Sequence, residues 1–525
     1  MTTANRQIAK AASIVMFAFV LSNLVGLLRQ ILVSNTFGTS SELDAFYAAV
    51  TIPDLLFNLM AGGALASAFI PIFTDEFEKK SASSAFYLSS AIINLILVFL
   101  GGASLLAFLF APNIVKDLIF LFKPNLDPGT AELTSELLKI IMIAPTIFGV
   151  SGIVMGILNT RSRFLMPALA PVFNWIGWII GLIFFVPSLG ILGLAWGYVL
   201  GAVLHLGVQI PQLIRLPDFK FVPTLGISQK SVHQVLSLMA PRLLGVSAVQ
   251  INFLINTMIA TSLGEGSLTA INIGRMIMTM PLFVIAQAIA TAALPTFAAQ
   301  IAKGQQAEMR DSLTSTLRGV LLLSVPSTFG LIVLREPLTE LLFERGEFTA
   351  QSTQLVAWAI LWYTAGLIGH SIVEILSRAF YALHDTKTPV KIGVLAMGMN
   401  VAFSFLFVWL FEKAGWMPHG GLAFANSLAT GIEALLLLYL VRKPLSGLNT
   451  RSVISGGWQY MLASVLMSLS IIAGLRLLNS NSALLDSILG ISLGLLVYPL
   501  ALIGIGNEEI KKIIGFVKNK LQTRS

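Results

Sequence analysis

The sequence contains no cysteine and only five histidines among 525 residues. The lack of cysteine excludes disulfides, thiolate metal sites and cysteine nucleophiles. The histidines are too far apart in sequence to form a metal-ligand pair at helical spacing. No glycine-rich phosphate loop, catalytic triad or pair of neighbouring carboxylates is present. The sequence therefore offers no constellation for an enzyme, and we expect none.

Charge is also scarce, at 11% of the residues, whereas 56% are hydrophobic. Soluble domains carry roughly 25% charged residues, so most of this chain must lie in lipid. The formal net charge is +8. In a membrane protein such an excess usually lies in loops that face anionic cytoplasmic head groups. We expect membrane lipids, and not nucleic acid, as partners.

Long hydrophobic segments are abundant. A spanning helix needs about 20 mainly apolar residues. The most N-terminal apolar segment, 11–36, is read as a span, because it is too long for a signal peptide and has no cleavage site. Fourteen segments qualify: 11–36, 44–73, 83–111, 133–158, 164–187, 190–214, 236–262, 267–299, 313–334, 353–380, 389–410, 420–441, 457–476 and 485–505. The sequence predicts an all-α polytopic membrane protein with about 14 spans.

The distribution of basic residues predicts the orientation of these spans. With an even number of spans both termini lie on one side, and 23 of the 33 Lys and Arg residues fall on that side, against six on the other. Because cytoplasmic loops are enriched in Lys and Arg, we expect both termini in the cytoplasm. The basic tail, 507–525, is typical of a short helix on the inner membrane surface.

An internal repeat divides the spans. Residues Ala64–Phe73 match Ala288–Phe297 at five of ten positions, and two shorter matches follow at nearly the same offset, Phe37-Gly38 with Leu263-Gly264 and Gly193–Trp196 with Gly421–Phe424. Six spans separate the matched segments, so the halves have parallel topology. We predict an N-lobe (1–215), a C-lobe (216–445), two appended spans (446–506) and a cytoplasmic tail (507–525).

Two such lobes suit a transporter, because rigid-body rocking of one lobe against the other opens a central cavity to either side of the membrane. This arrangement predicts alternating access. A channel is the alternative, but no short filter-like loop sequence is present.

Arginines inside the predicted spans are candidate binding residues, because a charge in the membrane is costly unless it faces water, a partner or a ligand. Arg29 in span 1 and Arg275 in span 8 fall in the outer half of the membrane, one in each lobe. Paired guanidinium groups suit a phosphate or diphosphate. Arg242 at the start of span 7 is a further anion ligand or a residue that snorkels to the interface. The alternative for Arg29 is an ion pair with Asp44 or Asp54.

Four amide and hydroxyl side chains inside spans form a candidate sodium site, the only cofactor that we consider. Asn252 and Asn256 lie in span 7, and Asn400 and Ser404 lie one turn apart in span 11. Their oxygens suit a small hard cation. Interhelical hydrogen bonds are the commoner use of such residues.

Several short motifs occur in order along residues 10–445. They include Gly26–Arg29, Asp44–Phe46, Ile52–Leu56, Gly63–Pro71, Pro167–Pro171, Ala240–Gly245, Arg345–Thr349 and Asp385–Pro389. Together they resemble the MviN/MurJ lipid II flippases of the multidrug/oligosaccharidyl-lipid/polysaccharide exporter superfamily.

The resemblance implies a fourteen-span flippase that carries undecaprenyl-diphosphate-linked muropeptide across the bacterial inner membrane for peptidoglycan synthesis. It also implies that Arg29 and Arg275 bind the diphosphate and sugar region, that Asp44 is a functional polar residue, and that spans 13 and 14 form a groove for the polyprenyl tail. Cell-wall synthesis or division proteins are further candidate partners.

The chain departs from the family pattern in span 2, where Phe57 and Asn58 replace two arginines. This loss of cationic groups leaves two alternatives open. One is the export of another lipid-linked glycan, and the other is a degenerate paralogue that does not transport.

Overall fold

The computed structural model describes residues 3–60, 64–123, 127–478, 480, 482–511 and 515. Within these ranges, side chains are described for all residues except 3–14, 60, 64–67, 241, 242 and 244. Every regular element of the described residues is helical. The helices group into two compact units, Met1–Leu268 and Thr269–Ser525.

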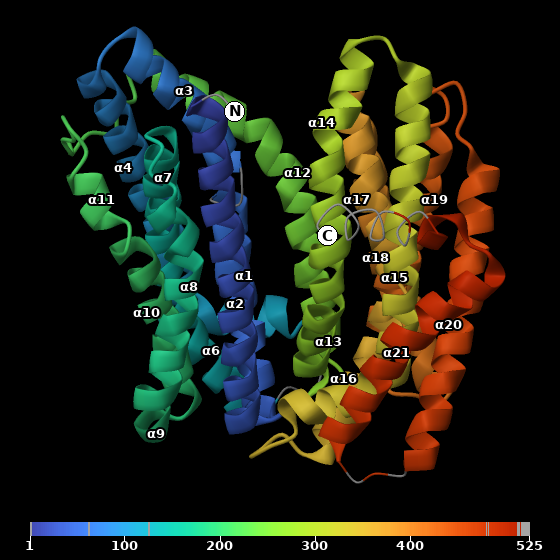
Figure 1. Ribbon diagram of the computed structural model, residues 1–525. Helices are drawn as coiled ribbons and strands as arrows, with labels where there is room; N and C mark the ends of the chain where they lie inside the picture. Colours follow the sequence, from blue (N-terminus) through green and yellow to red (C-terminus); the bar gives the residue numbers. More distant parts are fainter. Residues whose placement is uncertain are drawn as a thin grey trace. The chain divides into compact units, whose positions relative to one another are not determined.

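The first unit contains the helices up to α12 (Figure 1). They are α1 (Thr3–Phe37), α2 (Ser41–Met60), α3 (Ala64–Lys79), α4 (Ala82–Leu109), α5 (Ala111–Asn113), the π-helix η1 (Ile114–Ile119), α6 (Pro128–Ile141), α7 (Ala144–Thr160), α8 (Leu165–Ile180), the π-helix η2 (Gly181–Phe185), α9 (Val186–Leu189), α10 (Ile191–Gly207), α11 (Ile210–Ile214) and α12 (Lys230–Thr261).

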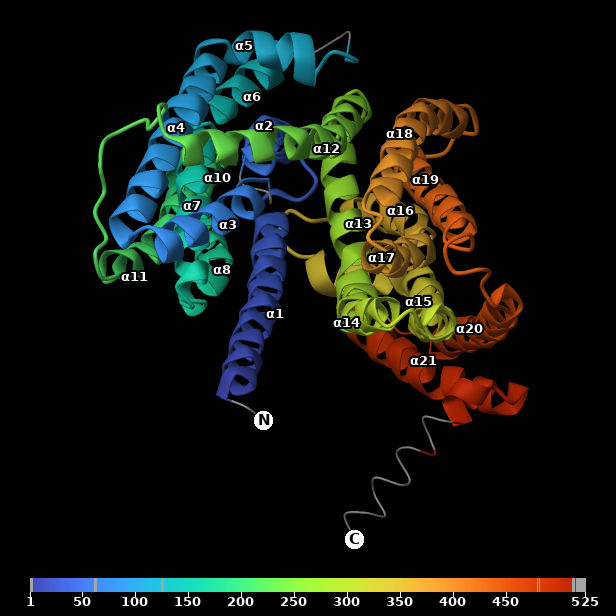
Figure 2. The ribbon, with the colours of Figure 1, turned by 90° about the horizontal axis from the view of Figure 1, so that it is seen from above.

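The second unit contains the remaining helices, of which α15, α20 and α21 pack against one another (Figure 2). They are α13 (Ser267–Pro281), the π-helix η3 (Leu282–Gln287), α14 (Ala288–Ala302), α15 (Gln306–Phe343), α16 (Ala350–Thr364), α17 (Leu367–Ala382), α18 (Lys387–Lys413), α19 (His419–Leu440), α20 (Thr450–Leu478) and α21 (Ala483–Ile505).

The predicted all-α membrane architecture is confirmed. Among the described residues, 11 helices are long and apolar enough to cross a membrane, or 13 if each of two bent helix pairs forms one span. The bent pairs are Lys230–Ala240 with Gly245–Thr261 and Ala350–Thr364 with Leu367–Ala382. The remaining predicted span, 44–73, corresponds to α2 and α3, and residues 61–63 between them lie outside the described ranges.

The boundary between the compact units differs from the predicted lobe boundary at 215/216. Packing assigns α12 to the first unit, because this helix lies against α2 and α3. The predicted lobes follow a sequence repeat, which is a separate criterion from packing. They stay a prediction.

Glycines bring α8 and α10 into backbone contact in the first unit. Gly177 on α8 and Gly181 at the start of η2 are four residues apart, and the same spacing separates Gly193, Gly197 and Gly201 on α10. A Cβ added at Gly177 would lie 2.3 Å from the Cα of Gly201, and one at Gly181 would lie 2.2 Å from the Cα of Gly197. Small residues at this spacing are the usual means of close helix packing in membranes.

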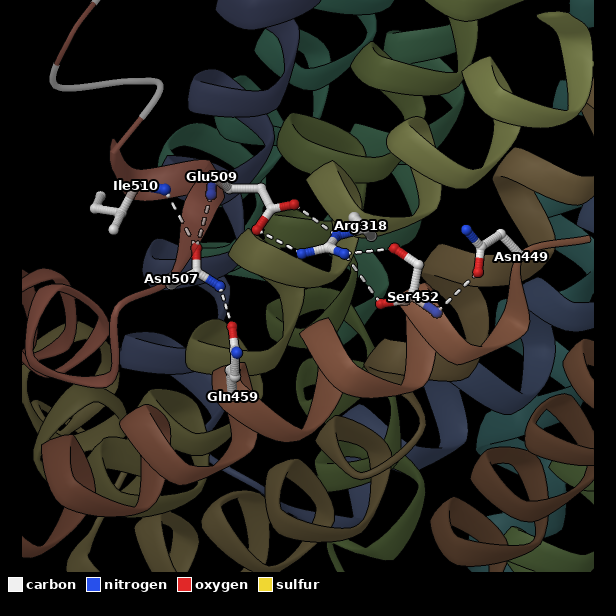
Figure 3. A network of polar contacts seen from close by, with 7 residues as sticks. All are labelled: Arg318, Asn449, Ser452, Gln459, Asn507, Glu509 and Ile510. Carbon is white, nitrogen blue, oxygen red and sulfur yellow. Dashed lines mark hydrogen bonds and ion pairs between the residues drawn. The ribbon is translucent and has the colours of Figure 1, made fainter.

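An ion pair anchors the segment after α21 to the second unit (Figure 3). The Arg318 guanidinium on α15 contacts both carboxylate oxygens of Glu509, with Nε to Oε1 at 2.5 Å and Nη2 to Oε2 at 2.7 Å. Arg318 also donates to the Ser452 hydroxyl on α20, and Asn507 donates to Gln459 on α20. Three separate parts of the chain thus meet at one arginine.

The Arg318–Glu509 pair gives a testable contribution to stability. Only 16% of the Arg318 side chain and 21% of the Glu509 side chain are exposed, so we expect Glu509→Gln to lower the free energy of unfolding by about 1–3 kcal/mol. Arg318→Gln should have a similar effect, and the double substitution should cost less than the sum of the two. Thermal unfolding in detergent, followed for all three variants, measures this coupling, and additive effects would contradict it.

The pair also predicts a pH dependence. Burial alone would raise the pKa of Glu509, but hydrogen bonds from Arg318 and the arginine's charge outweigh it and hold this pKa below its usual 4.5. The stabilisation is therefore present above the pKa of the unfolded carboxyl and is lost as the pH falls through the lower folded value. The difference in stability between the wild type and Glu509→Gln should accordingly shrink in acid.

Candidate functional site

Arg29 lies between two indole rings in the first unit. Its helix α1 packs against α8 (Figure 1), and the guanidinium carbon is 4.7 Å from the ring centroid of Trp175 and 4.5 Å from that of Trp178. Gly26 makes this approach possible, since a Cβ there would already lie 3.3 Å from Trp175 Nε1. A desolvated cation–π contact contributes about 2 kcal/mol, so the two rings stabilise a buried charge without neutralising it.

The guanidinium of Arg29 retains capacity to bind an anion. The residue is only 9% exposed, and its Nε is buried without a hydrogen-bond partner. The alternative of an ion pair with Asp44 or Asp54 stays a prediction, and Asp54 is an electrostatic neighbour of Arg29. A buried guanidinium with a free N–H group is suited to an anionic ligand that enters from outside the protein.

Asp54 and two tyrosines lie around Arg29. Tyr198 on α10 donates to Asp54 Oδ1 at 2.9 Å, and Tyr47 on α2 donates to Gln30 Oε1 at 3.0 Å. Asp54 and Tyr47 are the electrostatic neighbours of Arg29. The acid is thus held near the arginine by a hydrogen bond from another helix, which orients the site.

Phe57 contributes an aromatic ring at a position where the resemblance implies an arginine. Its ring centroid is 5.0 Å from that of Phe148, and Phe148 in turn contacts Tyr198 at 6.1 Å. Tyr198 lies 5.1 Å from Trp178. Phe57 therefore extends the aromatic cluster beside Arg29. The cluster itself carries no positive charge, so the charge here comes from Arg29.

Asp44 connects the start of α2 to the loop after α12. Its Oδ2 accepts from the backbone N–H of Gly266 at 2.8 Å, while Glu265 Oε1 accepts from the N–H of Ser41 at 2.8 Å. Gly266 has a φ of 76°, and a Cβ there would lie 2.7 Å from the carbonyl oxygen of Thr39. The geometry gives Asp44 a role in holding this loop, whereas the sequence predicts only a functional polar residue.

Arg275 belongs to the second unit, so each arginine is described within its own unit. It lies half-buried on α13, with Tyr363 of α16 as an electrostatic neighbour. The preceding Gly274 allows close packing, since a Cβ there would be 2.8 Å from the Cβ of Ala359. The third predicted arginine, Arg242, is on α12, but its side chain lies outside the described residues.

The predicted sodium ligands occur as two pairs. Asn256 donates its Nδ2 to the backbone oxygen of Asn252 at 2.8 Å within α12 of the first unit. Asn400 and Ser404 on α18 of the second unit are buried, at 4% and 0% exposed. Among the described residues, no group of three or more His, Asp or Glu could hold a metal ion. The sodium site stays a prediction.

The aromatic residues around Arg29 are the part of the site that sequence reasoning missed. Trp175 and Trp178 are three residues apart on α8, which places both on one helix face. This spacing in the sequence indicates an aromatic surface on the helix. The sequence does not predict their contact with Arg29, about 150 positions earlier in the chain, because this contact depends on the packing of α1 against α8.

These features define a polytopic helical membrane protein with a buried arginine in one of its spans. A family model described as lipid II flippase MurJ matches residues 33–497. The chain belongs to the lipid II flippase MurJ family. It is 31% identical over 472 residues to the lipid II flippase MurJ of Burkholderia cenocepacia, covering 87% of each chain, and 30% identical to a probable lipid II flippase MurJ of Vibrio cholerae, covering 83% of each.

Solved structures show the same fold. A lipid II flippase MurJ in an inward closed conformation aligns with a TM-score of 0.77 and 24% identity, covering 94% of this chain and 99% of that one. An inward-facing MATE family multidrug resistance transporter of the MOP superfamily aligns with a TM-score of 0.67 and 15% identity, covering 81% and 94%. The predicted helical membrane fold is thereby confirmed.

Proposed function

We propose that this protein is a lipid II flippase, which moves undecaprenyl-diphosphate-linked muropeptide across the bacterial inner membrane by alternating access. Family membership over residues 33–497 supports the substrate class. The single structural observation that carries the proposal is the buried guanidinium of Arg29, with its Nε free of any hydrogen-bond partner. A diphosphate is the part of lipid II that such a group would bind.

Further parts of this proposal rest on the sequence. Both termini lie in the cytoplasm, as the distribution of Lys and Arg indicates. Arg275 and Arg242 add positive charge along the path of the diphosphate, and the helices α20 and α21 take the polyprenyl tail. Sodium binds at Asn400 and Ser404 or at Asn252 and Asn256, and cell-wall synthesis or division proteins are the partners. The protein acts as a transporter and not as an enzyme.

Complementation tests the function directly. The native lipid II flippase of a model bacterium is depleted, this chain is expressed in its place, and outward exposure of lipid II is measured. We expect growth and lipid II exposure to be restored, because the family match extends over residues 33–497 and Arg29 keeps a buried N–H group for the diphosphate. Failure by a well-expressed and correctly inserted chain would contradict lipid II as the substrate and would favour another lipid-linked glycan.

A further inference from the structure

Helix α19 carries an acidic residue inside a membrane span. Glu433 lies seven residues before the end of the helix at Leu440, which is about 10 Å at a rise of 1.5 Å per residue. A glutamate side chain is too short to reach the interface over that distance. An intramembrane acid is costly and is therefore a candidate functional group.

Glu433 lies on the polar, inward side of α19. At 100° per residue, it is nearly in line with Asn426 and close to Thr430, while Leu435 is on the opposite side. Leu435 is 67% exposed, as expected of a lipid-facing residue, whereas Glu433 is half-buried. The carboxylate therefore belongs to a polar stripe that faces the neighbouring helices.

The other members of this stripe bind a histidine. His370 on α17 contacts Asn426 Oδ1 through its Nε2 at 3.2 Å and lies 3.5 Å from the Thr430 hydroxyl. On α18, Gly393 lies beside the acid, since a Cβ there would be in van der Waals contact with Glu433 Oε1 at 3.4 Å. The carboxylate thus lies on a helix that packs against both α17 and α18, with the polar groups of His370, Asn426 and Thr430 on its side of α19.

No cation neutralises Glu433 in the part of the chain that the structure describes. No hydrogen bond or ion pair involves its carboxylate there. On α17, Arg378 is paired with Glu374 at 3.6 Å. On α18, the exposed Lys391 is two residues from Gly393 and so projects to the opposite side of the helix.

The remaining side chains that face α19 are neutral or distant from the acid. Lys387 begins α18 and is exposed, and Glu412 is at the far end of that helix. Helix α16 contains no Asp, Glu, Lys or Arg, and its titratable group is Tyr363. His370 is therefore the titratable group that shares the polar stripe with Glu433.

We propose that Glu433 is a proton-binding site that couples lipid transport to the proton gradient. A proton adds to a carboxylate oxygen to form the neutral acid when the site opens to the outside, and it returns to water when the site opens to the cytoplasm. Outward movement of the lipid would then be driven by inward movement of the proton. The coupling rests on the proposed flippase function, but proton binding by Glu433 does not.

A proton suits this site better than a metal ion. Within the described ranges Glu433 belongs to no group of three or more His, Asp or Glu that could hold a metal ion. The polar groups on its side of α19 are one hydroxyl and one amide, whereas metal ions need several oxygen ligands. Neutralisation by a proton also removes the cost of an unpaired charge in the membrane. A sodium site at Glu433 would need ligands that the described residues around it do not supply.

Infrared titration tests proton binding without the substrate. The reconstituted protein should show a protonated carboxyl band near neutral pH, because protonation removes an unpaired charge from the membrane span. We expect Glu433→Gln to remove this band, and the control Glu412→Gln, at the exposed end of α18, to leave it unchanged. A band that survives in Glu433→Gln, or that disappears when sodium is added, would overturn the proposal.

Transport in vesicles tests coupling. Lipid II flipping is measured under an imposed pH gradient with the membrane potential clamped. The wild-type rate should change by up to about tenfold per pH unit, because each unit is a tenfold difference in proton activity, and Glu433→Gln should flip at a rate independent of the gradient. A wild type that flips at the same rate under every gradient would overturn the coupling while the flippase function stands. Absence of flipping by every variant would overturn the flippase function, and the infrared result would still decide proton binding.

Discussion

Replacing Arg29 with alanine is expected to abolish lipid II transport while the protein still folds. A charge-assisted hydrogen bond contributes about 1.5–3 kcal/mol, so the loss of two such bonds to a diphosphate should weaken binding by about 100-fold or more. Complementation and the rate of lipid II exposure measure this effect. The stability of the variant should change little, because the lost contacts with Trp175 and Trp178 are offset by removal of a buried charge.

The matched control is Arg29→Lys. Lysine keeps the positive charge but lacks the planar fork that binds a diphosphate through two parallel hydrogen bonds. We therefore expect partial activity, between that of the wild type and that of Arg29→Ala. Full activity of Arg29→Ala at normal protein levels would show that Arg29 serves only packing. Equal loss of activity and of folded protein in both variants would assign it a structural role.

The sequence predicts the membrane-spanning helices well, because the length of an apolar segment is a local property. It also indicates Arg29, since a charge inside an apolar run is visible without a structure. It does not indicate what surrounds that arginine. The indole contacts require α1 to pack against α8, and no pattern within either helix specifies that pairing.

Asp44 and Glu433 show two further limits of sequence reasoning. Asp44 is recognised as a functional residue only through family resemblance, and its actual partner, the Gly266 backbone, lies 222 positions away. Glu433 lies in a span that was predicted, yet its significance depends on which side of α19 faces the neighbouring helices. The partner of Asp44 and the surroundings of Glu433 are both set by tertiary packing, which cannot be predicted from the positions of charged residues along the sequence.

Gly177→Ala is expected to have the largest effect on folding, because it changes the packing of α8 against α10. A Cβ at Gly177 would lie 2.3 Å from both the Cα and the N of Gly201. Backbone atoms cannot move aside as a flexible side chain can, so α8 and α10 must separate. Overpacking usually costs about 1–3 kcal/mol, and a clash between two backbones should reach or exceed the upper end of that range.

The consequence extends to the Arg29 site, because the two helices also supply Trp178 and Tyr198, whose rings meet at 5.1 Å. We expect Gly177→Ala to lower the thermal midpoint in detergent and to reduce transport by the protein that remains folded. The control is Gly207→Ala at the end of α10, where an added Cβ would meet no atom within 4 Å. If both variants unfolded at the same temperature as the wild type, the α8–α10 backbone contact would not exist in the membrane. The position of Trp178 beside Arg29 would then need another cause.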